Sequence, residues 1–246
     1  MPVPPASLAD RLGRIAALTN AERAAIVALE ARDRHVRRGA VLIDQGARPT
    51  EIYVLARGVM ASRVCGVGDW RRLTRLYLPG DLMTTGALVL RESQEMLVAL
   101  ADCVVHPVDR AALGAVLGDY PRLATLLMVD EQIERTKLTE RMIAIETTPP
   151  AARVAALLID LRDRLRAVDK GISASFMLPF DPPEIGEAVA LKPAEAIRAL
   201  QQLEEARLIA RDAGRVCLVD ENGLYRMAGG RSGSATLELG WLLRRG

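Results

Sequence analysis

Short apolar and alternating segments separated by glycine dominate the chain between residues 36 and 108. Typical runs are AVLIDQG, EIYVLARGVMASRV and EMLVALADCVVHPV, with glycines at positions 39, 46, 58, 66, 68 and 80. Period-two alternation fits strands that bury one face, and glycine between such runs marks turns. The pattern predicts many short antiparallel strands in a barrel or roll. Before it, a capping box at Thr19-Asn20-Ala21-Glu22 predicts a helix to about Ala31.

Helical periodicity replaces the strand pattern from about residue 110 to residue 146. The run is more than 20 residues long, whereas helices average about 11–12 residues. Its three- and four-residue spacing is regular towards the end and irregular between Val129 and Lys137. Such a seam favours a helix that pairs with a second copy of the chain, and an ordinary core helix is the alternative. The positions assigned to the dimer contact are Leu126, Ile133, Leu138, Met142 and Ile145.

The segment Thr147-Thr148-Pro149-Pro150 ends this helix, because proline disfavours helical geometry in the residue before it and lacks an N–H donor. A new amphipathic helix follows, with Val154, Leu158 and Leu161 on one face. The fold class predicted is α+β. The expected units are a β-roll with an N-terminal helix (1–118), a dimerisation helix and hinge (119–148), a winged helix-turn-helix (149–228), and a tail without an assigned role (229–246).

The stretch from residue 184 to residue 220 has the layout of a winged helix-turn-helix. Asp181-Pro182-Pro183-Glu184 is a capping box that starts a short helix ending near Ala190, and Pro193 opens a second helix. Two apolar runs around Asp212-Ala213-Gly214 predict the hairpin wing. The inner face of the second helix is expected to consist of Ala196, Ile197, Leu200 and Leu203.

A winged helix-turn-helix places its second helix in the DNA major groove, so double-stranded DNA is the expected partner. Arg198 is the best candidate for a base or phosphate contact, and Lys192 at the helix N-terminus is the next. The wing arginines suit phosphates. The alternative is a helix pair and ribbon used only for packing. The candidate DNA-binding residues are Lys192, Glu195, Arg198, Gln202, Arg211 and Arg215.

Charge does not by itself indicate a nucleic-acid partner. The 246-residue chain has a net charge of +2, and residues 149–230 contain 11 Lys/Arg against 12 Asp/Glu, a net of −1. DNA binding therefore requires a local basic face, because the charge of the whole unit does not supply the attraction.

Other features narrow the class of protein. Cys65, Cys103 and Cys217 lack the spacing of a disulfide framework or a zinc site, so a reducing cytoplasm is expected. The N-terminus does not read as a signal peptide, and no apolar run of about 18 residues indicates a membrane partner. With two histidines in separate segments and no nucleophile set or phosphate loop, an enzyme is not expected.

The order of these features resembles the CRP/FNR (cAMP receptor protein / fumarate-nitrate regulator) family of bacterial transcription factors. The resemblance rests on RRGAVLIDQG, IYVLARGVM and LYLPGDLM, then a long helix, a hinge and a winged helix, over about residues 15–228. It implies a homodimer whose roll senses a small molecule or redox state. The hinge would bring two recognition helices to successive major grooves, about 34 Å apart. RNA polymerase is a further candidate partner.

The chain departs from this family in the recognition helix. Matching the family's helix-turn-helix places its usual arginine and glutamate near Pro193 and Ala194, and its later arginine on Arg198. Readout of guanine by a bidentate arginine at the first position is therefore lost. Recognition is expected to fall on Lys192, Glu195 and Arg198.

The sensor segment departs as well. Cyclic-AMP-binding members carry a Gly-Glu pair and a later Arg-Ser pair, where this chain has Thr84-Thr85 and Ser93-Gln94. Arg91 lies about two residues out of register. These residues are the candidate effector pocket, and the missing ribose and phosphate partners argue against cAMP. No cysteine precedes Cys65, which argues against an iron–sulfur cluster.

The residues present also bear on haem and thiol sensing. Haem sensing requires placed ligands, and His35 and His106 are interpreted as structural or exposed. Cys65 is a candidate thiol sensor, with a buried structural cysteine favoured. The main hypothesis is thus a homodimeric transcription regulator with an unidentified effector. The alternative is a small-molecule or redox sensor whose winged helix contacts protein rather than specific DNA.

Overall fold

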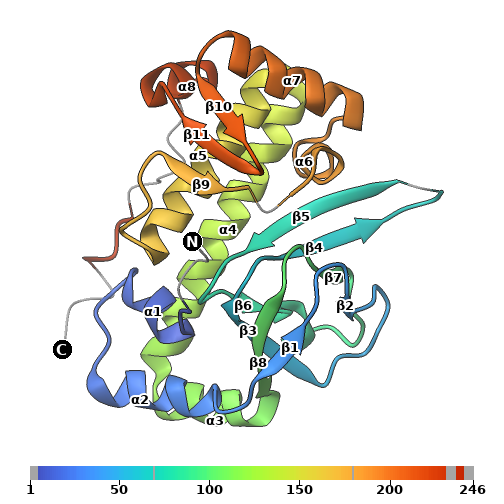
Figure 1. Ribbon diagram of the computed structural model, residues 1–246. Helices are drawn as coiled ribbons and strands as arrows, with labels where there is room; N and C mark the ends of the chain where they lie inside the picture. The colour runs from blue at the N-terminus through green and yellow to red at the C-terminus, as the bar shows by residue number, and fades with distance from the viewer. Residues whose placement is uncertain (1–4, 69, 179, 231–236, 241–246) are drawn as a thin grey trace.

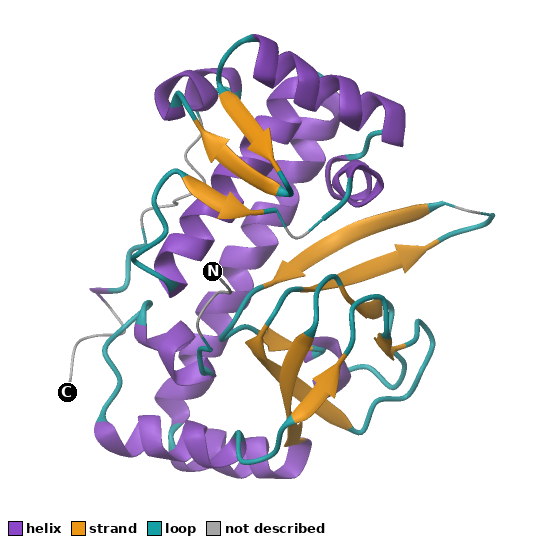
Figure 2. Ribbon diagram, in the orientation of Figure 1, coloured by secondary structure: helices purple, strands orange, loops and turns teal. Residues whose placement is uncertain are grey.

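The computed structural model describes residues 5–68, 70–178, 180–230 and 237–240. A β-roll and a winged-helix unit lie at opposite ends of a long helix, α4 (Pro121–Thr147), which runs through the molecule (Figures 1 and 2). The α+β class expected from the sequence is confirmed. Most of the C-terminal tail, residues 231–236 and 241–246, lies outside the described residues.

The roll consists of two four-stranded antiparallel sheets with the strand orders β1-β8-β3-β6 and β2-β7-β4-β5. Tyr53 and Leu55 from the first sheet share a buried cluster with Met60 and Leu97 from the second. The strands are β1 (Arg34–Val36), β2 (Val41–Ile43), β3 (Glu51–Arg57), β4 (Met60–Cys65), β5 (Arg71–Tyr77), β6 (Leu82–Met83), β7 (Met96–Ala99) and β8 (Cys103–Asp109).

The register of the strands points the apolar side chains of the alternating pattern into the roll. β3 pairs with β8 from Glu51 opposite Asp109, and β4 pairs with β5 from Met60 opposite Tyr77. A short 3-10 helix, η1 (Thr85–Leu88), follows β6. The long β4–β5 hairpin projects from the roll and lies beside α6 (Pro182–Val189) of the winged-helix unit (Figure 1).

Three short helices close the other end of the roll: α1 (Leu8–Gly13), α2 (Asn20–Leu29) and α3 (Arg110–Asp119). The predicted capping box at the start of α2 is present, since Thr19 and Glu22 exchange side-chain and backbone hydrogen bonds. The helical region from residue 110 is two helices rather than one. α3 and α4 meet at an angle of 114°, because Tyr120, with φ of −127° and ψ of 71°, leaves the helical region and Pro121 starts a new helix.

Helix α4 has a buried side towards the roll and an exposed side. Leu126 is fully buried, in a cluster with Leu12 and Leu123. Its predicted part in a dimer contact is therefore wrong, because the protomer's own core already covers it. Ile133 is half-buried, whereas Leu138, Met142 and Ile145 are 39%, 62% and 37% exposed. In the described part of the chain no single helix is long and apolar enough to cross a membrane.

The winged-helix unit begins with α5 (Pro150–Val168), whose N-cap is Pro149 and whose first residue is Pro150, the two prolines predicted to end the preceding helix. Asp181 and Glu184 form the expected capping box at the start of α6. Residues Ser175–Met177 form a third strand, β9, which the sequence did not indicate. It pairs with β11 of the wing. The remaining elements are β9 (Ser175–Met177), α7 (Pro193–Glu205), β10 (Ile209–Asp212), β11 (Arg215–Leu218) and α8 (Glu221–Met227).

The winged-helix unit and the roll share one hydrophobic core. A single cluster of buried residues joins Leu76 and Leu100 of the roll to Leu158 and Leu161 of α5 and to Leu200 of α7. Two ion pairs flank this core, Arg63 with Glu187 at 2.7 Å and Arg38 with Glu184 at 3.6 Å. The helix-turn-helix is thus held against the roll by apolar burial as well as by charge.

Candidate nucleic-acid interface and sensor cavity

The turn between α6 and α7 is packed too tightly for most side chains. A Cβ on Gly186 would come within 2.6 Å of the backbone oxygen of Leu191. Ala190 ends α6 in the left-handed conformation, with φ of 61°. From α5, the guanidinium of Arg153 donates to the carbonyl oxygens of Val189 (3.1 Å) and Ala190 (3.3 Å). These contacts fix the angle at which α7 leaves the turn.

Helix α7 presents one exposed face. Lys192, Arg198 and Gln202 are exposed, and the side chains of Lys192 and Arg198 make no ion pair with any described residue. Glu195 is exposed but partly engaged, because its carboxylate accepts the N–H of Lys192 at 2.8 Å. Its predicted role in reading bases therefore competes with capping of the helix.

The inner face of α7 differs from the prediction at one position. Ala196, Leu200 and Leu203 are buried as expected, but Ile197 is 41% exposed and Ala199 is buried in its place. The three- and four-residue steps from Ala196 lead to Ala199, Leu200 and Leu203, which leaves Ile197 on the outer side. An apolar side chain thus joins the face assigned to DNA.

The wing contributes two exposed arginines that already have partners. Arg211 forms a two-point ion pair with Glu204 of α7, at 3.0 and 2.7 Å. The hydrogen bonds from Arg211 lower the pKa of Glu204. Arg215 donates to the hydroxyl of Ser175 at 3.3 Å. Arg211 is therefore half neutralised within the protein and supplies less attraction for a phosphate than Arg198 does.

A polar cavity of about 240 Å³ opens in the roll. It gathers four of the predicted effector residues, Thr84, Thr85, Ser93 and Gln94. Arg91 is exposed and is not among the residues around the cavity, so the prediction for Arg91 is wrong. The sequence did not single out four other polar residues of the lining: Ser62, Tyr77, Glu92 and Glu95. Ser62 of β4 and Tyr77 of β5 reach the cavity only through the fold, whereas Glu92 and Glu95 lie in the loop before β7, beside Ser93 and Gln94.

Two buried hydroxyls, from Ser62 and Tyr77, and the half-buried carboxylate of Glu95 define the chemistry of this cavity. The hydroxyls of Ser62 and Tyr77 are 3.0 Å apart, and Glu95 accepts from Thr74 at 2.6 Å. Burial raises the pKa of Tyr77 to about 12, so this phenol stays protonated. One of the two O–H groups donates in this hydrogen bond, so the other remains available to donate to a ligand. Among the described residues that line the cavity, none is a lysine or an arginine.

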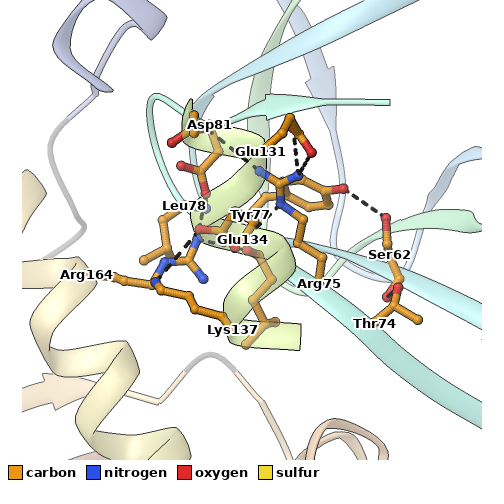
Figure 3. Close-up of polar contacts among 12 residues, drawn as sticks. Ser62, Thr74, Arg75, Tyr77, Leu78, Asp81, Glu131, Glu134, Lys137 and Arg164 are labelled. Carbon is orange, nitrogen blue, oxygen red and sulfur yellow. Dashed lines mark hydrogen bonds and ion pairs between the residues drawn. The ribbon is translucent and has the colours of Figure 1, made fainter. Parts of the chain in front are cut away.

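Behind Tyr77, a buried ionic network leads away from the cavity to α4 (Figure 3). The guanidinium of Arg75 lies 4.9 Å from the centre of the Tyr77 ring and donates to Glu131 at 3.0 Å. It also lies 3.7 Å from Glu134. Burial by itself raises the pKa of Glu134, but surrounding cations, chiefly Arg164 and Arg75, lower it to about 2.

The same network continues to α5. Arg164 donates to Asp81 at 2.7 Å, and Lys137 of α4 lies 3.1 Å from Asp160 of α5. Arg11 of α1 closes the network through Asp130, at 2.7 Å. A continuous set of polar contacts therefore runs from the sensor cavity through β5 and α4 to the first helix of the winged-helix unit.

The cysteines and histidines lie apart from these sites. Cys65 is a half-buried free thiol at the end of β4, and burial raises the pKa of Cys103 to about 11. His35 is exposed, whereas His106 faces the backbone oxygen of Arg32 at 3.1 Å.

Comparisons with known proteins agree with this architecture. Residues 152–227 match the Crp-like helix-turn-helix domain. The transcriptional activator protein FnrA of Stutzerimonas stutzeri is 24% identical over 200 residues, which is 81% of each chain. The anaerobic regulatory protein of Aggregatibacter actinomycetemcomitans is 23% identical over 73% of this chain and 69% of its own. FixK2 from Bradyrhizobium japonicum superposes with a TM-score of 0.72 at 20% identity, over 80% of this chain and 96% of its own.

A β-roll with a polar cavity, a long helix and a winged helix with an exposed recognition face define a DNA-binding transcription regulator with a cyclic-nucleotide-binding-like fold. Residues 152–227 match the Crp-like helix-turn-helix family, and the chain as a whole is similar to regulators of the CRP/FNR type.

Proposed function

We propose that this regulator is a cytoplasmic homodimer that binds a specific DNA sequence and responds to an effector other than cAMP. In this proposal residues 1–118 sense the effector, residues 119–148 pair the subunits and residues 149–228 bind DNA. Arg198 carries the proposal. It is an exposed guanidinium in the second turn of α7, on a helix whose angle is fixed by the contacts of Gly186 and Arg153.

Dimer formation is supported by the exposed side of α4. Leu138, Met142 and Ile145 follow one another at steps of four and three residues and are all exposed. This is the spacing of a coiled-coil seam, and a second copy of α4 would bury it. Two recognition helices would then meet DNA together, which doubles the contacts available to a short α7.

An effector without a phosphate group is supported by the cavity in the roll. A buried phosphate needs a guanidinium or several backbone N–H donors, and the described lining supplies hydroxyls, an amide and the carboxylates of Glu92 and Glu95. Glu92 is exposed and pairs with Arg48 at 2.9 Å, so it is the half-buried carboxylate of Glu95 that would repel an anionic ligand. A neutral or positively charged polar molecule of modest size fits this lining better than a cyclic nucleotide does.

Communication between the two sites is supported by the network behind Tyr77. A ligand bonded to Tyr77 or Ser62 would alter the position of Arg75, which is shared between β5 and the α4 carboxylates Glu131 and Glu134. Because Arg164 and Lys137 tie the same network to α5, a shift there would turn the winged helix about Thr147–Pro150.

Selection from a random pool of DNA duplexes tests the proposal, followed by titration of the winning sequence at several salt concentrations. We expect an enriched motif with two-fold symmetry and affinity that falls steeply with salt, as phosphate contacts require. Arg198→Ala should weaken binding, whereas Arg23→Ala, an exposed arginine on α2, should not. A pool that shows no enrichment at any salt concentration would contradict the proposed function.

A further inference from the structure

Two apolar side chains occupy the part of α7 that faces outward. Ile197 is 41% exposed, and Ala194 lies one turn before it, also exposed. Residues three and four apart are neighbours on a helix surface, so Ala194 adjoins both Ile197 and Arg198. Pro193 precedes them and lacks an N–H. The first two turns of α7 therefore show an apolar patch, defined by Pro193, Ala194 and Ile197, beside one guanidinium.

Ile197 has no role in the protein's own packing that accounts for it. It belongs to none of the hydrophobic clusters found among the described residues, although Ala196, Ala199 and Leu200 around it do. A β-branched residue also has a lower helix propensity than alanine. Its solvent exposure and its low helix propensity both make isoleucine unfavourable at position 197 in the free protein. We therefore expect Ile197 to contribute favourably only when a partner covers it.

The surroundings indicate what covers this patch. Lys192 and Arg198 border it, and their charges are unpaired among the described residues, while Glu195 bends back to cap the helix. Glu205 lies at the far C-terminal end of α7. The occupant must offer negative charge at the edge and apolar groups in the middle. DNA offers both, because the major groove contains one apolar group, the C5 methyl of thymine, between rows of phosphates.

We propose that Ala194 and Ile197 select thymine through its C5 methyl group, next to the base or phosphate that Arg198 contacts. The inference rests on the proposed DNA-binding function. The N-terminal part of a recognition helix reads base edges, and the groups present at Pro193, Ala194 and Ile197 are hydrocarbon. They discriminate by apolar contact where a polar helix discriminates by hydrogen bonds.

Replacement of thymine by deoxyuridine tests this, because it removes the methyl group and leaves every hydrogen-bonding atom in place. In the selected duplex, each thymine is replaced in turn and the dissociation constant is measured at fixed salt. We expect one or two thymines per half-site at which binding weakens about fourfold, as for one buried methyl group. In the Ile197→Ala protein the penalty at one of these thymines should disappear, which is a direct coupling between side chain and methyl.

Control variants distinguish failure of thymine recognition from failure of the proposed DNA-binding function. Alanine favours a helix, so Ile197→Ala should fold, and Met227→Ala on α8, 38% exposed in the parent protein, should keep the full response to deoxyuridine. Specific binding that is indifferent to deoxyuridine at every position would overturn the inference and leave the proposed function standing. If binding is indifferent to deoxyuridine and Ile197→Ala also binds the duplex with unchanged affinity, the apolar patch would be assigned to a protein contact. Failure to bind any duplex specifically would overturn both.

Discussion

Arg164 of α5 and Asp81 of the turn after β5 form a buried ion pair, with 2.7 Å between Nη2 and Oδ2. The Asp81 carboxylate also accepts the N–H of Leu78, so it is held in the roll while it holds the winged-helix unit. Both side chains are almost completely removed from water. This pair joins the two functional halves of the protein and makes the stability of one depend on the other.

We expect Arg164→Leu to lower the free energy of unfolding by about 3–5 kcal/mol. Asp81 would be left as a buried charge whose remaining cationic partner is Arg11, at the longer distance of 3.4 Å. Denaturant-induced unfolding measures the change. The matched control is Arg23→Ala, which breaks the exposed pair with Asp10 and should cost less than about 1 kcal/mol. A loss below 1 kcal/mol for Arg164→Leu would show that the pair does not join the units.

Acid should destabilise the protein through Glu134. Its pKa falls from an ordinary 4.5 to about 2 in the folded state, because the cations around it outweigh the effect of burial. A depressed carboxyl pKa contributes stability above the unfolded value and loses it as the pH falls towards the folded value. The neighbouring Asp130 acts in the opposite direction, since burial raises its pKa.

Unfolding measured at about pH 5 and at about pH 3 should differ by on the order of 2 kcal/mol from Glu134 alone. In Glu134→Gln this part of the pH dependence should vanish, although the variant starts from a lower stability. An unchanged slope in Glu134→Gln would mean that other carboxyl groups carry the acid sensitivity.

Two arginines near the recognition face should differ in their effect on DNA. Arg198→Ala should cost about 1–3 kcal/mol of binding free energy, concentrated at one base pair if the guanidinium reads a base. Arg211→Ala should cost less, because Arg211 already pairs with Glu204 in the free protein. Titration of the selected duplex compares them, and equal losses would contradict the ranking.

The exposed seam of α4 predicts the effect of charge on assembly. Met142→Glu should raise the dissociation constant of the homodimer at least about tenfold, because it places a carboxylate in an apolar contact. Sedimentation velocity over a range of protein concentrations measures this. Glu140→Lys on the same helix, where the side chain is also exposed, serves as the control. A dimer that survives Met142→Glu must use another surface.

Two helical glycines should respond oppositely to alanine. Gly186→Ala brings a Cβ within 2.6 Å of the Leu191 oxygen, so the turn must open and stability should fall by about 1–3 kcal/mol. Gly114 of α3 has nothing within 4 Å of the same position, and Gly114→Ala should raise stability by about 0.5–1 kcal/mol. Thermal unfolding of both variants tests the prediction. Unchanged stability of Gly186→Ala would show that the turn can accommodate a Cβ atom.

Much of the architecture was predictable because its signals are local. The boxes at Thr19 and Asp181 depend on residues three apart, and both are present in the structure. The prolines at 149 and 150 separate α4 from α5, and the glycine-punctuated runs became the strands of the roll. β9 was missed because a three-residue strand depends on a partner, β11, about 40 residues later.

The candidate site was predictable in part. Four of the effector residues line one cavity because they lie on adjacent turns of a single segment, whereas Tyr77 and Ser62 reach it from β5 and β4. On α7, Ala196 and Ile197 are both apolar and adjacent in the sequence, and only packing against α5 and α6 decides which one is buried.

The sequence by itself determined the order of elements, their caps and breaks, and the helix-turn-helix, because each depends on the propensity and spacing of residues close along the chain. Only the tertiary structure decided which charges meet. Arg75, Asp81, Glu134 and Arg164 come from β5, the turn after it, α4 and α5, and each alone resembles a solvated surface residue. Burial of the shared core brings them together, and removal from water makes them form one network. The same packing left Ile197 outside, on the face where we propose that thymine is read.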